Sequence, residues 1–76
     1  MERAITGSII STQLGRLGSK QYGFIDVKTE GKEELKIKVA AFTKYDTLDI
    51  GAKVNIVAES IGDMAIMTAK SIAIAQ

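Results

Sequence analysis

Residues Lys20 to Phe42, KQYGFIDVKTEGKEELKIKVAAF, decide how the rest of this chain is interpreted. Apolar and polar residues alternate on both sides of the segment Thr29-Glu30-Gly31-Lys32, and a period of two is typical of a β-strand. The glycine and the polar residues of that segment suit a tight reversal of the chain. The stretch therefore predicts an antiparallel hairpin, with strands from Gln21 to Lys28 and from Leu35 to Phe42.

The two faces of the predicted hairpin differ in chemistry. One face is aliphatic and suits a core: Ile25, Val27, Leu35, Ile37 and Val39. The other face combines aromatic rings with lysines: Tyr22, Phe24, Lys28, Lys36, Lys38 and Phe42. Exposed rings among cations indicate a surface where unpaired bases stack while ammonium groups neutralise phosphates. The alternative is an ordinary solvated face, with Phe24 under a loop and Phe42 turned inward.

Length and composition limit the fold and the chemistry. Seventy-six residues with 46% hydrophobic and 25% charged residues predict one globular domain, residues 1–76, and the net charge is only +1. The absence of cysteine and histidine disfavours thiol, zinc and proton-shuttle chemistry, and the aspartates lie on separate segments. We therefore expect no enzyme, no cofactor and no metal site.

The sequence carries no signal for a membrane or for export. No run approaches the roughly 20 apolar residues of a membrane-spanning helix. The start, Met1-Glu2-Arg3-Ala4, lacks a signal-peptide core. These features predict a cytoplasmic protein without membrane insertion.

The chain before the hairpin predicts a bent strand and a loop. Residues Arg3 to Gln13 are rich in β-branched side chains, and Gly7 within them marks a bulge or bend. Residues Leu14 to Ser19, LGRLGS, are typical of a mobile loop. Arg16 of this loop is a candidate for wrapping a phosphate backbone, although a plain connector explains the glycines as well.

The chain after the hairpin predicts two more strands. Residues 42–49 have room for a turn or two of helix, after which Leu48 and Ile50 are expected to plug the core. Alternation predicts a fourth strand at Lys53–Glu59, a turn at residues 60–63 and a last strand within residues 64–75. In the last strand, one face is expected to hold Ile66, Thr68, Lys70, Ile72 and Ile74. The whole pattern predicts an all-β fold, a five-stranded OB-fold barrel with a short helical turn between strands 3 and 4.

Four segments resemble single-stranded DNA-binding OB-fold proteins. They are Gly18-Ser19-Lys20-Gln21-Tyr22, Ile37 to Lys44 (IKVAAFTK), Leu48 to Val54 (LDIGAKV) and Ala69 to Ile74 (AKSIAI). In that family such segments enter the second strand, end the third and open the fourth. The sequence departs from bacterial members in lacking tryptophan and an acidic C-terminal tail. The resemblance implies an OB-fold that binds single-stranded nucleic acid.

Two further families overlap the same residues. Lys20 to Ile25, KQYGFI, resembles the first RNA-binding motif of cold-shock domains, but their second motif has no counterpart in Leu35 to Ala41. Gly23-Phe24-Ile25 and Asp49 to Val57, with Gly7 to Ile10, are similar to the soluble OB domain of NfeD-type membrane proteins. That likeness implies a role beside membrane proteins without nucleic acid.

The leading hypothesis from the sequence is therefore sequence-tolerant binding of single-stranded nucleic acid, with DNA favoured over RNA. Stacking is assigned to the rings and phosphate contacts to the cations, so the predicted site is Arg16, Lys20, Tyr22, Phe24, Lys28, Lys36, Lys38, Phe42 and Lys44. The alternative is a protein-protein interaction module in which the same face anchors a partner. Homo-oligomerisation is left open.

Overall fold

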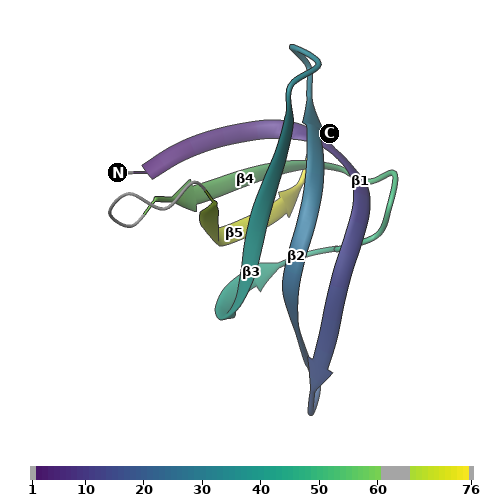
Figure 1. Cartoon of the computed structure of the whole chain (residues 1–76), viewed down its shortest axis with the longest axis vertical. Helices are drawn as coiled ribbons and strands as arrows, with labels where there is room; N and C mark the ends of the chain where they lie inside the picture. Colours follow the sequence, from purple (N-terminus) through teal and green to yellow (C-terminus); the bar gives the residue numbers. More distant parts are fainter. Residues whose placement is uncertain (1, 61–65, 76) are drawn as a thin grey trace.

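The computed structural model describes residues 2–60 and 66–75 of the chain. Its strands form one closed barrel in the order β1-β2-β3-β5-β4 (Figure 1). Their bounds are β1 (Glu2–Leu17), β2 (Lys20–Thr29), β3 (Glu34–Tyr45), β4 (Lys53–Glu59) and β5 (Met67–Ile74). The prediction of an all-β, five-stranded barrel is confirmed.

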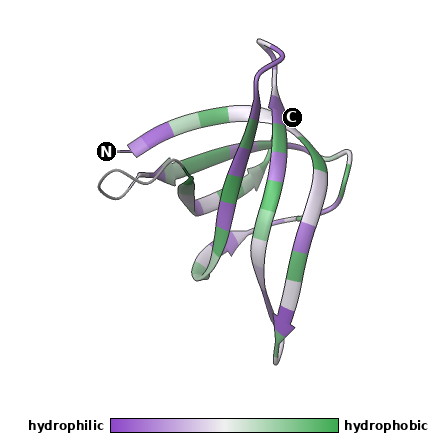
Figure 2. Cartoon of the chain, viewed as in Figure 1, coloured by the Kyte–Doolittle hydropathy of each residue, from purple (hydrophilic) through white to green (hydrophobic). Residues whose placement is uncertain are grey.

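The predicted hairpin is present with the predicted faces. Strands β2 and β3 pair antiparallel from Gly23 opposite Val39 to Lys28 opposite Glu34. Ile25 and Ile37 face each other inside the barrel and are almost fully buried. Figure 2 shows the matching alternation of hydrophobic and hydrophilic residues along these two strands. A period of two therefore determined both the pairing and the side of the sheet that enters the core.

The core is aliphatic and draws on all five strands. Its buried members are Ile5, Ile9, Ile25, Val27, Ile37, Val39, Leu48, Val54, Ile56, Ala58, Ala69 and Ile72. Leu48 plugs the core as expected, whereas Ile50 is 66% exposed. The prediction for Ile50 was wrong because Ile50 and Gly51 form a turn that carries the side chain into solvent.

Strand β1 is longer than predicted. Its first half pairs with β4, from Glu2 to Ser8, and its second half pairs with β2 as far as Leu17. Gly7 lies where β1 passes from one partner to the other, and a Cβ there would stand 2.4 Å from the Lys28 carbonyl oxygen. This close approach is the physical reason for glycine at position 7, whereas the bulge of β1 lies at Ile10 and not at the glycine predicted to mark it.

The prediction of a mobile loop at Leu14 to Ser19 was wrong. Residues Leu14 to Leu17 are strand, and only Gly18 and Ser19 form the turn into β2. Pairing with the start of β2 overrides the local signal of the two glycines. Gly18 supplies the positive φ, 65°, that the tight turn requires.

The prediction of a helical turn after β3 was also wrong, since residues 2–60 and 66–75 contain no helix. Strand β3 continues to Tyr45, and the connection to β4 is irregular. The Gly51 N–H donates to the Ile9 carbonyl at 2.7 Å, and the Asp49 N–H donates to Thr47 Oγ1 at 3.1 Å. These bonds fasten the connection to β1 and close local turns that compete with a helix.

The predicted last strand exists, but its faces were wrong. Val57 lies opposite Ser71 and Ala58 opposite Ala69, so Lys70 is an extra residue in the pairing of β5 with β4. This bulge puts Ala69 and Ile72 in the core and leaves Lys70 and Ile74 exposed. The predicted positions 61–65, in the turn and at the start of this strand, lie outside the described residues.

Candidate functional site

Strand β3 separates from β2 after the pair Gly23 and Val39. Its pairing with β5 shifts register between Val39 and Lys44, and we call residues 40–43 the β3 bend. Thr43 holds this bend: its side chain is buried, its Oγ1 donates to the Ala69 carbonyl at 2.6 Å and it accepts from the Ala40 N–H at 2.9 Å. Two hydrogen bonds from one buried hydroxyl thus make the bend part of the fold.

The end of the β1-β2 hairpin, residues 14–23, extends beyond the point where β3 leaves. We call these residues the hairpin end; it lies at the bottom of Figure 1. A groove of about 540 Å³ opens between the hairpin end and the β3 bend, and we call it the hairpin-end groove. Its lining is almost entirely uncharged: Leu17, Tyr22, Gly23, Phe24, Lys38, Val39, Ala40 and Ala41.

The three predicted aromatic residues lie outside the barrel, as the sequence indicated. Tyr22 is 46% exposed, and its ring lies against Gly15, where a Cβ would stand 3.3 Å from the ring carbon Cζ. Phe24 is half-buried, with the Lys36 ammonium 5.9 Å from its ring centre. Phe42 is 63% exposed on the β3 bend. The bend therefore turns Phe42 to solvent and away from the core.

The hairpin end and the β3 bend contain no carboxylate. Residues 12–25 and 37–45 contain four cations and no carboxylate, although the sequence has nine carboxylates: the cations are Arg16, Lys20, Lys38 and Lys44. Lys20 Nζ donates to the Ala41 carbonyl at 3.4 Å, so one of them spans the groove from β2 to the bend. The groove thus has an apolar wall inside a basic surrounding.

Three of the predicted cations lie away from the groove. Lys28 lies opposite Glu34, and Lys36 lies opposite Asp26, in pairs of opposite charge across β2 and β3. Lys44 is on β3 beyond the bend, opposite Ser71 of β5. The structure therefore brings Lys20 and Lys38 to the groove with the rings, but it does not arrange all the predicted lysines along one line.

Leu17, Ala40 and Ala41 were not predicted as site residues, and Leu17 is 75% exposed. Leu17 fell in the segment expected to be a loop, where its exposure carries no information. No local pattern in the sequence indicates it, because its place opposite Lys20 depends on the register of the hairpin.

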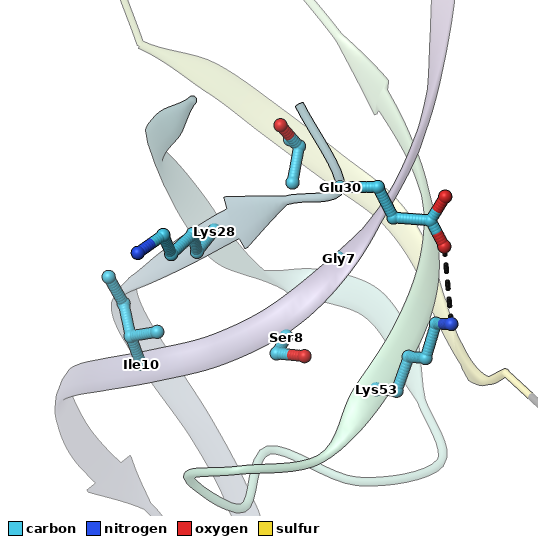
Figure 3. A pocket seen from close by; sticks show the side chains of 7 residues that line it. Gly7, Ser8, Ile10, Lys28, Glu30 and Lys53 are labelled. Atoms are coloured by element: carbon cyan, nitrogen blue, oxygen red, sulfur yellow. Dashed lines mark ion pairs between the residues drawn. The ribbon is translucent and has the colours of Figure 1, made fainter. Parts of the chain in front are cut away.

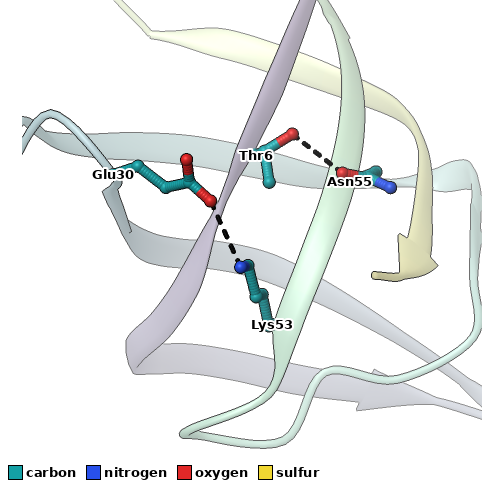
Figure 4. Close-up of polar contacts among 4 residues, drawn as sticks. All are labelled: Thr6, Glu30, Lys53 and Asn55. Atoms are coloured by element: carbon teal, nitrogen blue, oxygen red, sulfur yellow. Dashed lines mark hydrogen bonds and ion pairs between the residues drawn. The ribbon is translucent and has the colours of Figure 1, made fainter. Parts of the chain in front are cut away.

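A second, smaller pocket lies at the opposite end of the β1-β2 pair and has a different character. It measures about 270 Å³ and is lined by Gly7, Ser8, Ile10, Lys28, Thr29, Glu30 and Lys53 (Figure 3). Lys53 and Glu30 form an ion pair of 3.2 Å across it, and Thr6 Oγ1 donates to Asn55 Oδ1 nearby at 2.8 Å (Figure 4). Because two of its three charged residues, Lys53 and Glu30, pair with each other, this pocket is a weaker candidate for a ligand site.

Within the described part of the chain, a second ion pair joins Glu2 of β1 to the bulged Lys70 of β5 at 2.6 Å. The hydrogen bond and the charge of Lys70 hold the pKa of Glu2 below its ordinary value. The same contact raises the pKa of Lys70. Both groups are solvent-exposed, and the pair links β1 to β5, the two strands on either side of β4.

No three histidine, cysteine, aspartate or glutamate side chains of the described residues gather where they could hold a metal ion. Residues 2–60 and 66–75 contain no helix that could span a membrane. No family model and no curated protein matches the sequence.

Solved structures of CusF share the fold. Silver-bound CusF matches with a TM-score of 0.74 at 16% identity, covering 99% of both chains. A second silver-bound structure, from Escherichia coli, matches with a TM-score of 0.76 at 17% identity over 100% of this chain and 94% of that one. A copper(II)-bound variant from the same organism gives 0.72 at 18% identity over 99% and 92%. At these identities the likeness concerns the fold.

These matches correct the sequence-based prediction of function. The solved barrels that match are described with silver or copper bound, and none is described with nucleic acid. The prediction that this chain binds single-stranded DNA, with the nucleic acid as its partner, was therefore wrong. Its basis was a set of short motifs that follow the geometry of the barrel, and exposed rings beside lysines serve other binding surfaces equally well.

Proposed function

We propose that this chain is a non-catalytic OB-fold domain that binds an extended segment of a partner protein at the hairpin-end groove. The observation that carries the proposal is the apolar groove beside the hairpin end, which Lys20 and Lys38 border, with no carboxylate in residues 12–25 and 37–45. The strand order β1-β2-β3-β5-β4 and the bent β1 support the assignment to the OB class.

The side chains around the groove suit a protein partner. Leu17 and Phe42 are large, apolar and mostly exposed, although a monomeric protein gains stability by burying such groups. Protein interfaces place apolar and aromatic anchors at their centre and charged groups at the rim. The occupant that fits is therefore a segment with apolar side chains for the groove and carboxylates for Lys20 and Lys38.

The carboxylates of the described chain support a role without catalysis. Asp26, which lies next to Phe24 in β2, accepts a hydrogen bond of 2.5 Å from the Ser11 hydroxyl and faces Lys36 across the sheet. It is held in a structural contact, and no second carboxylate lies opposite it. At Asp26, general acid–base chemistry by paired carboxylates therefore has no second carboxylate across the strands to use.

A pair of matched peptides tests the proposal. The acidic probe peptide is short, alternates valine with glutamate, and carries blocked ends and a fluorescent label; the basic probe peptide has lysine in place of glutamate. Exposed ion pairs contribute about 0.2–1 kcal/mol each, so two or three of them give roughly tenfold tighter binding. We expect the acidic probe peptide to bind at least that much more tightly than the basic one in fluorescence anisotropy.

Variants locate the binding. Leu17→Ser and Phe42→Ser each remove one exposed apolar group of the groove region, and we expect both to weaken binding of the acidic probe peptide. Ile50→Ser removes an equally exposed isoleucine elsewhere on the barrel and serves as the matched control. Equal binding of the two probes, or equal losses in the control and the groove variants, would refute the proposal.

Binding of a soft metal ion is the second candidate, favoured by the fold shared with silver-bound and copper-bound CusF. The residues do not fit it. Copper(I) and silver(I) prefer thiolate, thioether and imidazole ligands, but the sequence has no cysteine, no histidine and three methionines. Of these, Met67 is the one that the structure describes, and it packs against the core.

A silver titration followed by native mass spectrometry separates the two candidates. We expect no stoichiometric silver adduct at protein concentrations that give clear probe binding. A tight one-to-one adduct that disappears in Met67→Leu would replace the groove proposal with metal binding.

A further inference from the structure

The second half of β1 has a free edge. Residues Glu2 to Thr6 of β1 pair only with β4, Gly7 and Ser8 pair with both β4 and β2, and Ser11 to Leu17 pair only with β2. Ile9 is the last residue of β1 that bonds on the outer side, donating to the Ala52 carbonyl and accepting from Gly51. Figure 1 shows this half of β1 beside β2, on the side away from β3. Within the described residues, no backbone group pairs with that edge from Ser11 to Leu17.

Such an edge directs unpaired N–H and C=O groups to solvent at every second residue. Proteins usually protect edges with proline, lysine or a bulge. The bulge of β1 at Ile10 lies before this segment, the sequence contains no proline, and Arg16 is its only charged residue. The edge is therefore long enough for several backbone hydrogen bonds and poorly protected against forming them.

The side chains next to this edge belong to the groove region. In register with β2, Gly15 lies opposite Tyr22 and Leu17 opposite Lys20. Because Gly15 has no side chain, the Tyr22 ring rests against its backbone and is reachable from the free edge. A strand beside β1 would place the side chain that neighbours Gly15 against Tyr22 and Leu17.

We propose, on the basis of the proposed function, that the partner segment binds as an added β-strand along Ser11 to Leu17 of β1. Its backbone groups complete the edge, and an apolar side chain beside Gly15 contacts the Tyr22 ring. Side chains at the alternate positions point to the opposite face of the sheet, where Arg16 lies, so the cations of the hairpin end favour acidic residues there. The same charges disfavour a second copy of this chain at the edge, because two basic ends would then meet.

Backbone methylation of the acidic probe peptide tests the strand directly. A methyl group on a peptide nitrogen removes the donor, and in an added strand every second N–H faces β1. We expect methylation of one alternate set of nitrogens to weaken binding roughly tenfold or more, and methylation of the other set to change it little. Amide exchange measured by NMR should show added protection at every second residue of Ser11 to Leu17.

Each other result has a definite meaning. Binding of the unmethylated probe that tolerates both methylated sets, without new protection in β1, would overturn the added strand while the groove proposal stands. Failure of the probe to bind at all would remove the proposed function and the strand together. Protection of the same amides without peptide, with a dimer in sedimentation, would show a second copy at the edge and overturn the proposal.

Discussion

The two ends of this small barrel are built from the same strands but differ in how completely their groups are paired. At the closed end, around Gly7 and Lys53, Gly7 and Ser8 of β1 pair with both β2 and β4, Val54 and Ile56 are buried, and two ion pairs join Lys53 to Glu30 and Lys70 to Glu2. At the hairpin end, β1 pairs on one side only and Leu17 is exposed. Paired strands and paired charges stabilise the closed end. At the hairpin end, the unpaired edge of β1 leaves backbone groups that a partner can bind.

The largest effect on stability is expected at Gly7 of the closed end. Gly7→Ala would place a methyl group 2.4 Å from the Lys28 carbonyl oxygen and 2.8 Å from Val27 Cγ1. Because backbone must move, we expect a loss of about 3 kcal/mol in the free energy of unfolding, a large part of the stability of such a domain. Urea unfolding followed by circular dichroism measures it.

Gly31→Ala is the matched control for this substitution. Gly31 lies in the turn between β2 and β3, and a Cβ there meets only Thr29 Oγ1 at 3.8 Å. We expect a change within about 0.5 kcal/mol. If both alanine variants unfold at the urea concentration of the wild type, the tight crossing at Gly7 is not what closes the barrel.

A smaller loss in the free energy of unfolding is expected from a substitution at Thr43, which holds the β3 bend. Thr43→Val keeps the shape but leaves the Ala40 N–H and the Ala69 carbonyl without their bonds to the hydroxyl. We expect a loss of about 1–3 kcal/mol and weaker binding of the acidic probe peptide, because the β3 bend forms one wall of the groove. Thr43→Ser, which retains the hydroxyl, should restore most of both. Full stability of Thr43→Val would show that the bend does not depend on these bonds.

How far the sequence could predict this molecule depends on the range of the interaction involved. The faces of β2 and β3 and the bounds of β4 followed from alternation, because one side of each strand is buried. The bulges at Ile10, the β3 bend and Lys70 did not, because they depend on which strands pair. Alternation predicts the buried side of a strand correctly only where each of its residues lies opposite one residue of the paired strand, without a bulge.

The candidate site divides in the same way. Tyr22, Phe24 and Lys38 were predicted, because they lie on the outer face of a regular hairpin. Leu17 and Ala41 were not, because the groove arises where β3 leaves β2, which no local pattern indicates. The ligand class was wrong for a related reason: rings and lysines describe a surface, whereas the balance between apolar walls and charge comes from its shape.

Reversing the charge of the hairpin end should change the choice of partner without changing the fold. Lys20→Glu combined with Lys38→Glu places two carboxylates beside an unchanged apolar wall. We expect the preference for the acidic probe peptide to disappear or reverse, roughly a tenfold change, with unfolding altered by less than about 0.5 kcal/mol. Fluorescence anisotropy at two salt concentrations measures it, and added salt should reduce the difference.

Arg3→Glu, at the start of β1 and also exposed, controls for net charge alone. It should leave the ratio of the two probe affinities unchanged. Equal effects of Arg3→Glu and the double lysine variant would mean that total charge, and not the hairpin end, selects the peptide.

The smallest effect is expected from pH at the closed end. The pKa of Glu2 is lowered by its hydrogen bond with Lys70, so the stabilisation is present above the ordinary value of 4.5 and is lost as pH falls through the lowered pKa. The pKa of Lys70 is raised, so its contribution is complete below 10.5 and is lost as pH rises through the raised pKa. Between these limits, unfolding midpoints should change little from this pair.

Glu2→Gln should remove the acid-side loss that belongs to this pair and should lower the midpoint slightly at neutral pH, since exposed pairs contribute little. A midpoint in Glu2→Gln that is unchanged at neutral pH and keeps the full acid dependence would show that the pair does not fasten β1 to β5.

We propose that the hairpin end binds the partner segment and that the closed end supports the hairpin end. An NMR titration with the acidic probe peptide tests this claim directly, by following the backbone amide signals of the whole domain. We predict that the perturbed amides fall in residues 11–24 and 38–44, while those of β4 and of the pocket around Lys53 stay in place. Perturbations centred on β4 or on that pocket, or no perturbation at all, would contradict it.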